Sequence, residues 1–493
     1  MQKIMRLDKS AVQDNLVIVF ACLMFIMQMF IYSSTTWDGW HDKIYLTGVF
    51  SEAALVFIAL FGKRVDKAEV KCLIFYLFWL VVTRYMNNDI RLEKSANHLR
   101  IVIACVSVII CGMALDRNKR QKALNIVAVL MSTFFFLLSL AAIYSAVIRA
   151  DLNLPFGISF EIRKYDATHY FQIMPCSNRN LTSFWLVVSC CLILYLMTVC
   201  KKKVLYIPLT AALVTQYVAV GLSMSRGSMI ALSIALAMFI ILLVDKKSAN
   251  GKLGIRIVVL TLTAIVSLLV FYKGFAVLCG AVDSLRSVFV PAQETVIMNS
   301  ADADEDTVET SAAETAEQEK KTDAAAFSDP RTMENTLLLG GRVENWLSAI
   351  AAIRVEPERL LKGGIFKEYM TLPNLLNQNK LASRHVDYGH MHNYLIDTLL
   401  LTGIVGLTLM LLFTLLLVLR MIKVFFAREI ALPIKTLTIL LAACLVKNMV
   451  DTIIFNFDDI TNFLFCFIAG IFLSYSYELL PAKKPETGTV QPE

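Results

Sequence analysis

Long apolar runs alternate with short polar segments along the whole chain. Most runs hold close to the ~20 apolar residues that an α-helix needs to cross the hydrocarbon core of a bilayer. The pattern predicts about twelve membrane-spanning helices. They cover residues 14–33, 44–62, 69–86, 100–115, 123–147, 181–199, 204–222, 228–244, 256–278, 393–419, 435–455 and 461–478. We therefore predict an all-α polytopic membrane protein.

The polar segments form two sets that alternate along the chain. One set is short and basic: "GKRVDKAEVK", "DRNKRQK", "CKKKV", "DKKSANGK" and "RMIKVFFAR". Basic loops stay on the cytoplasmic side of a membrane, so both termini are predicted to be cytoplasmic and the second set extracytoplasmic. The second set holds all 6 histidines: His41, His98, His169, His385, His390 and His392.

Composition narrows the class further. The chain is 57% hydrophobic and 18% charged, with a mean hydropathy of +0.62, which excludes a soluble globular protein. The net charge of +7 lies mostly in short loops, where it sets topology, so we expect no nucleic-acid partner. The 11 cysteines show no CxxC or Cys/His ligand spacing, and we predict neither a metal site nor a cofactor.

One predicted outer segment, residues 279–392, is too long for a passive connection. Its acidic part, 299–329, is nearly free of large apolar residues, which predicts a disordered insert. Residues 340–356 carry apolar positions at helical spacing around Trp346, which predicts an interfacial helix. The expected organisation is transmembrane helices in 1–278, this large extracytoplasmic loop in 279–392, transmembrane helices in 393–478 and a cytoplasmic tail in 479–493.

Two arginines stand where a cation is costly. Arg226 lies in the turn "SMSRGS", too close to hydrocarbon for full hydration, and the small residues around it suit phosphate oxygens. Arg342 falls in the first turn of the predicted loop helix, where the helix dipole disfavours a cation and attracts an anion. Snorkelling of Arg226 and ordinary hydration of Arg342 are the competing interpretations.

The stretch "YGHMHNYLIDTLLL", residues 388–401, sets imidazoles against the start of an apolar run. His390 and His392 can each take or give a proton near neutral pH. Asn393 and Asp397 stand four residues apart beside His392, so Asp397 can orient a group there.

Other charged residues also lie in or near the predicted spans. Glu52 and Arg84 fall near the outer ends of their spans. Lys447 and Asp451 stand four residues apart in the span 435–455, so they share a helix face and can neutralise each other. We interpret this pair as mainly structural, with lining of the site as the alternative.

Three sequence elements occur in order on the predicted outer side: "SMSRGS", "GGRVENWLSAI" and "HNYLIDTLLLTGIVGL". Together they resemble the O-antigen ligase and O-antigen polymerase superfamily of bacterial membrane glycosyltransferases. That family shows a Ser-Arg turn, a G-R-x-x-x-W helix and an H-N-x-x-L…G-x-x-G-L helix start. By motif the resemblance covers residues 204–420. The chain departs from the family in its acidic insert and at Lys362-Gly363-Gly364, where a Gly-x-Gly run is common.

The resemblance implies a GT-C-like fold that works without a metal or other cofactor. It implies a glycan donor carried on undecaprenyl pyrophosphate, and transfer to an acceptor that is a glycan or is lipid-linked. The reaction would invert the anomeric centre at the outer face of the bacterial cytoplasmic membrane, beside other polysaccharide-assembly proteins. By motif the catalytic residues are Arg226, Arg342 and His392. As candidate substrate-binding residues we add His390, Asn393, Arg84 and Asp397.

Other functional classes stay open at this point. A polysaccharide flippase or other secondary transporter would have a similar number of spans, but internal repeats and midplane polar residues are expected there and neither is evident. A metalloenzyme would use His385, Asp387, His390 and His392, whose spacing matches no established motif. A scaffolding membrane protein is a further alternative. Within the favoured class, the sequence does not decide between ligase and polymerase.

Overall fold

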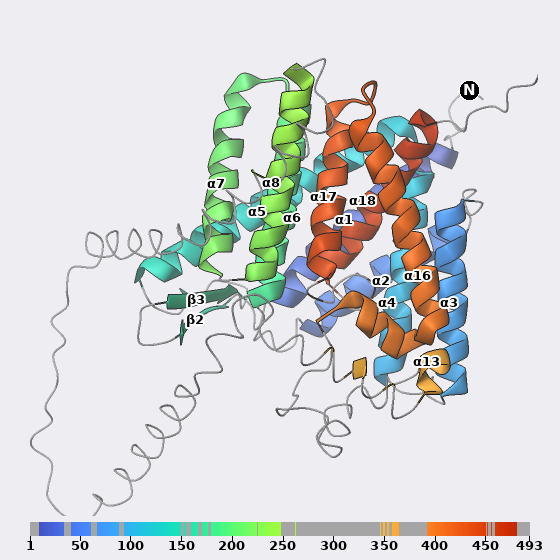
Figure 1. The fold of residues 1–493 in the computed structure, drawn as a ribbon. Coiled ribbons are helices and arrows are strands. Elements are labelled where there is room, and N and C mark those ends of the chain that lie inside the picture. The colour runs from blue at the N-terminus through green and yellow to red at the C-terminus, as the bar shows by residue number, and fades with distance from the viewer. Residues whose placement is uncertain are drawn as a thin grey trace, which may run out of the picture.

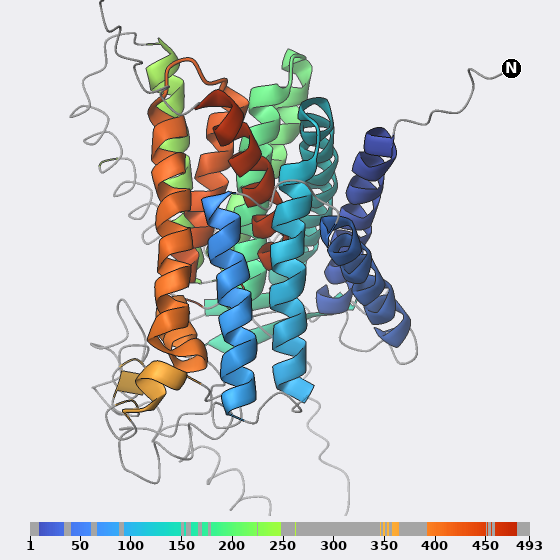
Figure 2. The same cartoon turned by 90° about the vertical axis from the view of Figure 1, so that its right-hand side faces the viewer.

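The computed structural model describes residues 9–33, 41–60, 67–87, 93–148, 152–153, 159–165, 170–175, 179–223, 225–247, 262, 346, 349–350, 353, 357–363, 392–449, 451, 455 and 459–480. These residues form a bundle of long helices with one small sheet near its end (Figures 1 and 2). The helices are α1 (Lys9–Ser33), α2 (His41–Leu60), α3 (Ala68–Met86), α4 (Glu93–Ala114), α5 (Arg117–Ile148), α6 (Arg179–Val199), α7 (Tyr206–Leu222), α8 (Arg226–Lys247), α13 (Arg359–Lys362), α16 (Tyr394–Phe426), α17 (Leu432–Asn448) and α18 (Ile460–Leu479).

The predicted class, a polytopic helical membrane protein, is confirmed. Within the described residues, 8 helices are long and apolar enough to cross a membrane, and Tyr45–Leu60 is a shorter apolar helix. Every predicted span overlaps a described helix except 256–278, which lies outside the described residues apart from residue 262. The loop region 279–392, including the expected insert at 299–329, is described only at 346, 349–350, 353, 357–363 and 392, and 346, 349–350 and 353 are helical.

Helix α18 forms the centre of the bundle, and all its residues from 460 to 476 are buried. It packs most closely on α4. Gly112 of α4 faces Gly470 of α18 at this crossing. A Cβ added at either glycine would come closer than 3.0 Å to a backbone carbonyl of the other helix. Small residues allow such close approach of helix backbones in a membrane. The hydroxyl of Ser474 also donates to the Met113 carbonyl at 3.0 Å, so this crossing is fixed by both shape and a hydrogen bond.

The two ends of the bundle differ in chemistry. We call the end where α8 and α16 begin the site end, and the other the opposite end (Figure 1). At the opposite end, Arg420 of α16 pairs with the buried carboxylate of Glu69 in α3, and the Tyr477 hydroxyl of α18 donates to the same carboxylate. The Arg420 guanidinium also lies 3.6 Å from the centre of the Tyr477 ring. This polar knot ties three helices together.

A second ion pair reinforces the same end. Arg120 of α5, itself 1% exposed, pairs with Glu478 at 2.7 Å and donates to the Leu115 carbonyl. Buried guanidinium groups need several partners, and these contacts supply them.

A small antiparallel sheet follows α5, in a region for which the sequence predicted only a polar loop. Its strands are β1 (Leu152–Asn153), β2 (Ser159–Tyr165) and β3 (Tyr170–Pro175), in the order β1-β2-β3. Strand β2 pairs with β3 in a register that sets Ile162 opposite Ile173. The sheet contacts α5 and α6, and it lies at the site end (Figure 1).

The polar knot gives a stability prediction. Replacing Glu69 by Gln removes the counter-charge of Arg420 and should lower the free energy of unfolding by about 2–3 kcal/mol, since Arg420 is partly exposed. The measurement is the temperature at which purified protein loses its monodisperse size-exclusion peak. Lys119→Ala is the control, because its hydrogen bond to Asn15 lies at the surface. A Glu69→Gln variant as heat-resistant as wild type would contradict the assignment.

Candidate active site

Helix α16 starts directly after the two polar residues His392 and Asn393. The Asn393 side-chain oxygen accepts hydrogen bonds from the backbone N–H groups of Leu395 at 3.0 Å and Ile396 at 3.2 Å. This is an N-cap, which satisfies backbone donors that have no partner within the helix. The Asn393 amide nitrogen donates to the Met449 carbonyl at 3.0 Å. Asn393 therefore begins α16 and ties it to the end of α17.

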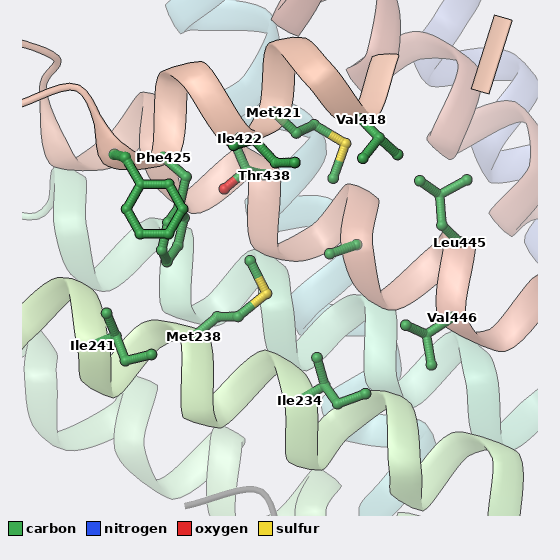
Figure 3. Close-up of a pocket in the computed structure, with 12 residues that line it drawn as sticks. Ile234, Met238, Ile241, Val418, Met421, Ile422, Phe425, Thr438, Leu445 and Val446 are labelled. Carbon is green, nitrogen blue, oxygen red and sulfur yellow. The ribbon is translucent and has the colours of Figure 1, made fainter. Parts of the chain in front are cut away.

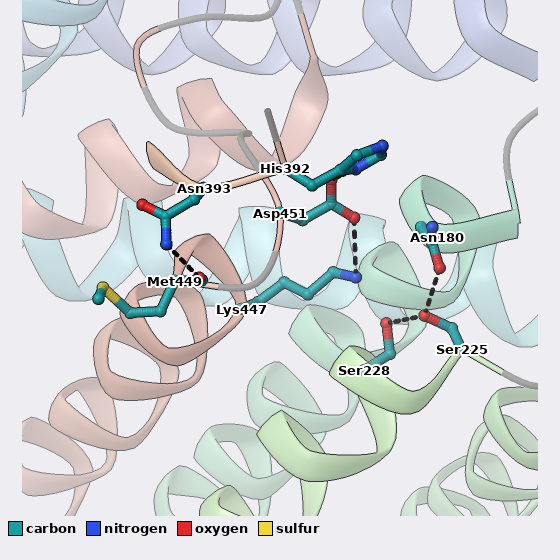
Figure 4. A network of polar contacts seen from close by, with 8 residues as sticks. All are labelled: Asn180, Ser225, Ser228, His392, Asn393, Lys447, Met449 and Asp451. Atoms are coloured by element: carbon teal, nitrogen blue, oxygen red, sulfur yellow. Dashed lines mark hydrogen bonds and ion pairs between the residues drawn. The ribbon is translucent and has the colours of Figure 1, made fainter. Parts of the chain in front are cut away.

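His392 forms an array with two charged residues, Asp451 and Lys447, which we call the histidine cluster (Figure 4). Nδ1 of His392 lies 3.1 Å from Oδ1 of Asp451, and Nζ of Lys447 lies 3.2 Å from Oδ2 of the same carboxylate. A carboxylate only accepts hydrogen bonds, so Nδ1 of His392 is the donor, which leaves Nε2 as the basic atom. The ring is 16% exposed and Lys447 is not exposed at all.

The backbone of His392 adopts an unusual conformation. Its φ angle is +52°, in the left-handed region that residues other than glycine rarely enter. Such conformations persist where surrounding contacts enforce them, and they concentrate at functional sites. Here the enforcing contacts are the Asp451 carboxylate on one side and the Asn393 cap on the other.

Two described residues between α17 and α18, Phe455 and Asp459, make hydrogen bonds to neighbouring helices. The backbone N–H of Phe455 donates to Asn462 at 2.9 Å. Asp459 caps α18 by accepting from the Thr461 N–H at 3.0 Å, and it also accepts from the indole of Trp185 at 2.8 Å. Burial raises the pKa of Asp459 to about 6, although these hydrogen bonds partly offset the increase.

The start of α8 carries a second polar group, the serine cluster of Asn180, Ser225 and Ser228. The Ser225 hydroxyl lies 3.0 Å from Oδ1 of Asn180 and 3.1 Å from the Ser228 hydroxyl. Both serines are buried, whereas Arg226 at the first position of α8 is exposed. The buried serines fix the turn and leave the Arg226 guanidinium accessible.

The histidine cluster and the serine cluster both lie at the site end of the bundle. Helices α8 and α17 pack against each other in antiparallel directions, and Ile234 and Leu445 both line a cavity beside them. Figure 4 shows the Lys447 ammonium extending toward the serine cluster. Arg226 follows Ser225 at the first position of α8, so it lies at the same end of the bundle as His392.

An apolar cavity of about 380 Å³ lies between α8, α16 and α17 (Figure 3). We call it the apolar groove. Thr438 is the one polar side chain among the described residues that line it; Met238, Met421 and Phe425 are typical of the rest. It follows α8 from Ile234 to Ile241, about 10 Å at 1.5 Å per residue. Its end nearest the site end is lined by Val446, the residue before Lys447.

The structure brings some predicted site residues together and places others apart. Arg226 and His392 share the site end. Arg84 is also near the site end, in the last turn of α3, but it is fully buried between α3 and α4, with Nη2 3.4 Å from Nδ1 of His98. Asp397 is buried one turn into α16. Substrate binding by Arg84, Asn393 and Asp397 stays a prediction. Arg342 and His390 lie outside the described residues, as do His385 and Asp387.

Sequence reasoning undervalued one residue, Asp451. Its spacing from Lys447 predicted an ion pair, and the pair is present at 3.2 Å. Its contact with His392 joins positions 59 apart in the chain, and no local pattern indicates such a contact. Within the described residues, no group of three His, Cys, Asp or Glu side chains is placed to hold a metal ion.

The comparisons with known proteins give one family. The family described as O-Antigen ligase has a sequence profile that matches residues 211–411, from α7 through the first half of α16. The matched segment contains Arg226, Arg342 and His392, whereas Asp451 lies beyond it. No curated protein matches the chain.

The ion pair of the histidine cluster gives a second stability prediction. Asp451→Ala should lower the free energy of unfolding by about 3–5 kcal/mol, because it removes a counter-charge of the buried Lys447. Adding Lys447→Met should restore most of that loss, since a Met side chain needs no counter-charge. Thermal unfolding of both purified variants measures this. A double variant no more stable than Asp451→Ala would contradict the pairing as a source of stability.

Proposed function

Residues 211–411 form an O-antigen ligase family domain, and from this premise we propose that the protein is a membrane glycosyltransferase. It transfers a glycan from polyprenyl pyrophosphate to the hydroxyl of an acceptor sugar, at the outer face of the cytoplasmic membrane. Ligase and polymerase reactions use the same kind of donor and differ in the acceptor, so the proposal covers both. Both termini are proposed to be cytoplasmic, which makes the site end extracytoplasmic.

One observation carries the proposal: a histidine held by a carboxylate and an exposed arginine share the site end of the bundle, and an apolar groove runs toward that end. A polyprenyl pyrophosphate glycan has one part suited to each of these features. Its chain is apolar, its pyrophosphate is anionic, and its sugar receives the attacking hydroxyl. The match between the array and this amphiphile supports a lipid-linked donor.

His392 is proposed to act as the general base. The acceptor oxygen attacks the anomeric carbon and gives its proton to Nε2 of His392. The Asp451 carboxylate holds the Nδ1–H and stabilises the imidazolium that forms, while the Lys447 ammonium pairs with the other carboxylate oxygen. A positioned base of this kind accelerates proton transfer by about 10²–10⁴-fold.

The site must also stabilise the negative charge of the leaving group. The bond from the anomeric carbon to the phosphate oxygen breaks, and its electron pair stays on the pyrophosphate. Arg226 is proposed to neutralise this charge with a bidentate contact, which suits a guanidinium better than an ammonium. Arg342 is proposed to do the same from the large loop, on the basis of its motif. Attack from the face opposite the leaving group inverts the anomeric centre.

The catalytic assignment predicts the effect of three substitutions. With purified protein and a lipid-linked glycan donor, His392→Ala should lower the transfer rate by about 10²–10⁴-fold. Arg226→Ala should lower it by about 10²–10³-fold, and Arg226→Lys less, because a lysine keeps the charge and loses the fork. Rates are compared at equal amounts of monodisperse protein.

Two outcomes would count against this assignment. Full activity of both His392→Ala and Arg226→Ala would remove it. The transporter alternative would be favoured by a different pair of results. Wild-type protein in vesicles would move the lipid-linked glycan across the membrane, and the same protein in detergent, where no gradient exists, would form no joined product.

The apolar groove predicts a change in donor affinity. Ala442→Trp fills the groove from α17 and should raise the donor KM about tenfold, equivalent to about 1.4 kcal/mol of lost binding, with little change in kcat. Leu411→Trp is the control, since Leu411 is exposed on α16 outside the groove. Lower stability without a KM change would indicate that a protein segment, such as the predicted span 256–278, fills the groove.

A further inference from the structure

Helix α16 is sharply kinked at Gly403, which has φ +66° and ψ −171° (Figure 1). This combination is essentially restricted to glycine. The kink divides α16 into a short segment, residues 394–402, and a long segment that continues to Phe426. His392 lies just before the short segment, so the direction taken at Gly403 bears on where the imidazole lies.

The large loop contacts α16 at this kink. Helix α13 and the following Gly363 pack on α16, and Gly363 has a positive φ of 58°. A Cβ added at Gly363 would come closer than 3.0 Å to the backbone of Thr402 and Gly403. A Cβ added at Gly403 would collide with the carbonyl oxygen of Leu361. The contact is backbone against backbone, and a side chain at either glycine would prevent it.

A third element holds the same point from the other side. The indole nitrogen of Trp79 in α3 donates to the Thr402 carbonyl at 2.7 Å. Trp79 and Thr402 are 323 positions apart, and α3 packs along α16. The kink is therefore held between α13 of the loop and α3 of the bundle. We call Gly363, Gly403 and Trp79 the kink clamp.

Simple geometry shows why this point matters for His392. The short segment is nine residues long, or about 14 Å at 1.5 Å per residue. A change of about 10° at the kink moves its far end by about 2 Å. A misplacement of about 1 Å can cost about 10²-fold in rate. The contacts of His392 with Asp451 and of Asn393 with Met449 fix the far end, and the kink clamp fixes the near end.

From these contacts we propose that Gly363, Gly403 and Trp79 are positioning residues for the transfer step. They set the direction of residues 394–402, so that the imidazole of His392 meets the acceptor hydroxyl. Because Gly363 directly follows α13, the clamp also joins α13 to the helix that follows the general base. This inference rests on the proposed function, in which His392 is that base.

The test compares two glycines at which an added Cβ would clash to a similar degree with a backbone carbonyl oxygen. Gly403→Ala forces a Cβ into the Leu361 carbonyl at the kink, and Gly470→Ala forces one into the Ile109 carbonyl at the α4–α18 crossing. We expect Gly403→Ala to lower kcat by about 10- to 100-fold with a donor KM within about twofold of wild type. Gly470→Ala should lower thermal stability and leave the kcat of the folded fraction near wild type. An equal fall of kcat in both variants would overturn the proposal.

Introducing Gly403→Ala into a His392→Ala protein distinguishes an effect on the position of His392 from a general loss of folded structure. If Gly403 acts through His392, Gly403→Ala adds no further loss of rate in a His392→Ala protein. A further loss of the same factor there would overturn the proposal.

Trp79→Phe keeps the proposal testable if Gly403→Ala does not fold. It removes only the donor to the Thr402 carbonyl, and we expect a fall in kcat of about 3- to 10-fold. An unchanged kcat would overturn the role of Trp79. Absence of transfer by the wild-type protein would instead refute the proposed function, so the two failures are distinguishable.

Discussion

A lysine with no exposed surface needs a counter-charge, and at the end of α17 the Asp451 carboxylate supplies one to Lys447. The rest of the site depends on this pair. A buried ion pair contributes little net stability when compared with apolar residues of the same size, but removing one partner is costly. The carboxylate is thereby held in place, and its second oxygen contacts Nδ1 of His392. One electrostatic requirement thus accounts for both the ion pair and the imidazole orientation.

The two ends of the bundle use charge differently. At the opposite end, the pairs of Glu69 with Arg420 and Arg120 with Glu478 are closed by tyrosine rings and hydroxyls, which suits a structural role. At the site end, Arg226 is exposed and His392 is partly exposed, so charge and basicity remain accessible. The core between them is set by the glycine crossing of α4 and α18. This arrangement lets the site end carry strained and polar residues on a rigid base.

Much of the helical framework follows from the sequence, because hydrocarbon admits only segments whose backbone groups are satisfied internally. The apolar runs located the helices, although α17 ends at Asn448 and not at 455 as predicted, which leaves Asp451 in the following turn. The placement of His392 at a helix start also followed from the polar-to-apolar transition. The contact between His392 and Asp451 could not be predicted from the sequence, because it depends on how α16 and α17 pack. The kink clamp was equally unpredictable: the motif glycines were recognised, but their mutual contact arises only in three dimensions. The sheet after α5 lies in a segment whose polarity indicated a loop.

The length of the apolar groove has a consequence for how much of the donor lipid the protein would recognise. The groove follows α8 for about 10 Å, roughly a third of the ~30 Å hydrocarbon core. A polyprenyl chain is far longer than that, so among the described residues the groove would contact only the first isoprene units of the chain. Selection by this groove would then depend little on chain length, which would mainly govern how firmly the donor stays in the membrane. Short-chain, water-dispersible analogues would retain the contacts that the full-length lipid makes with the groove.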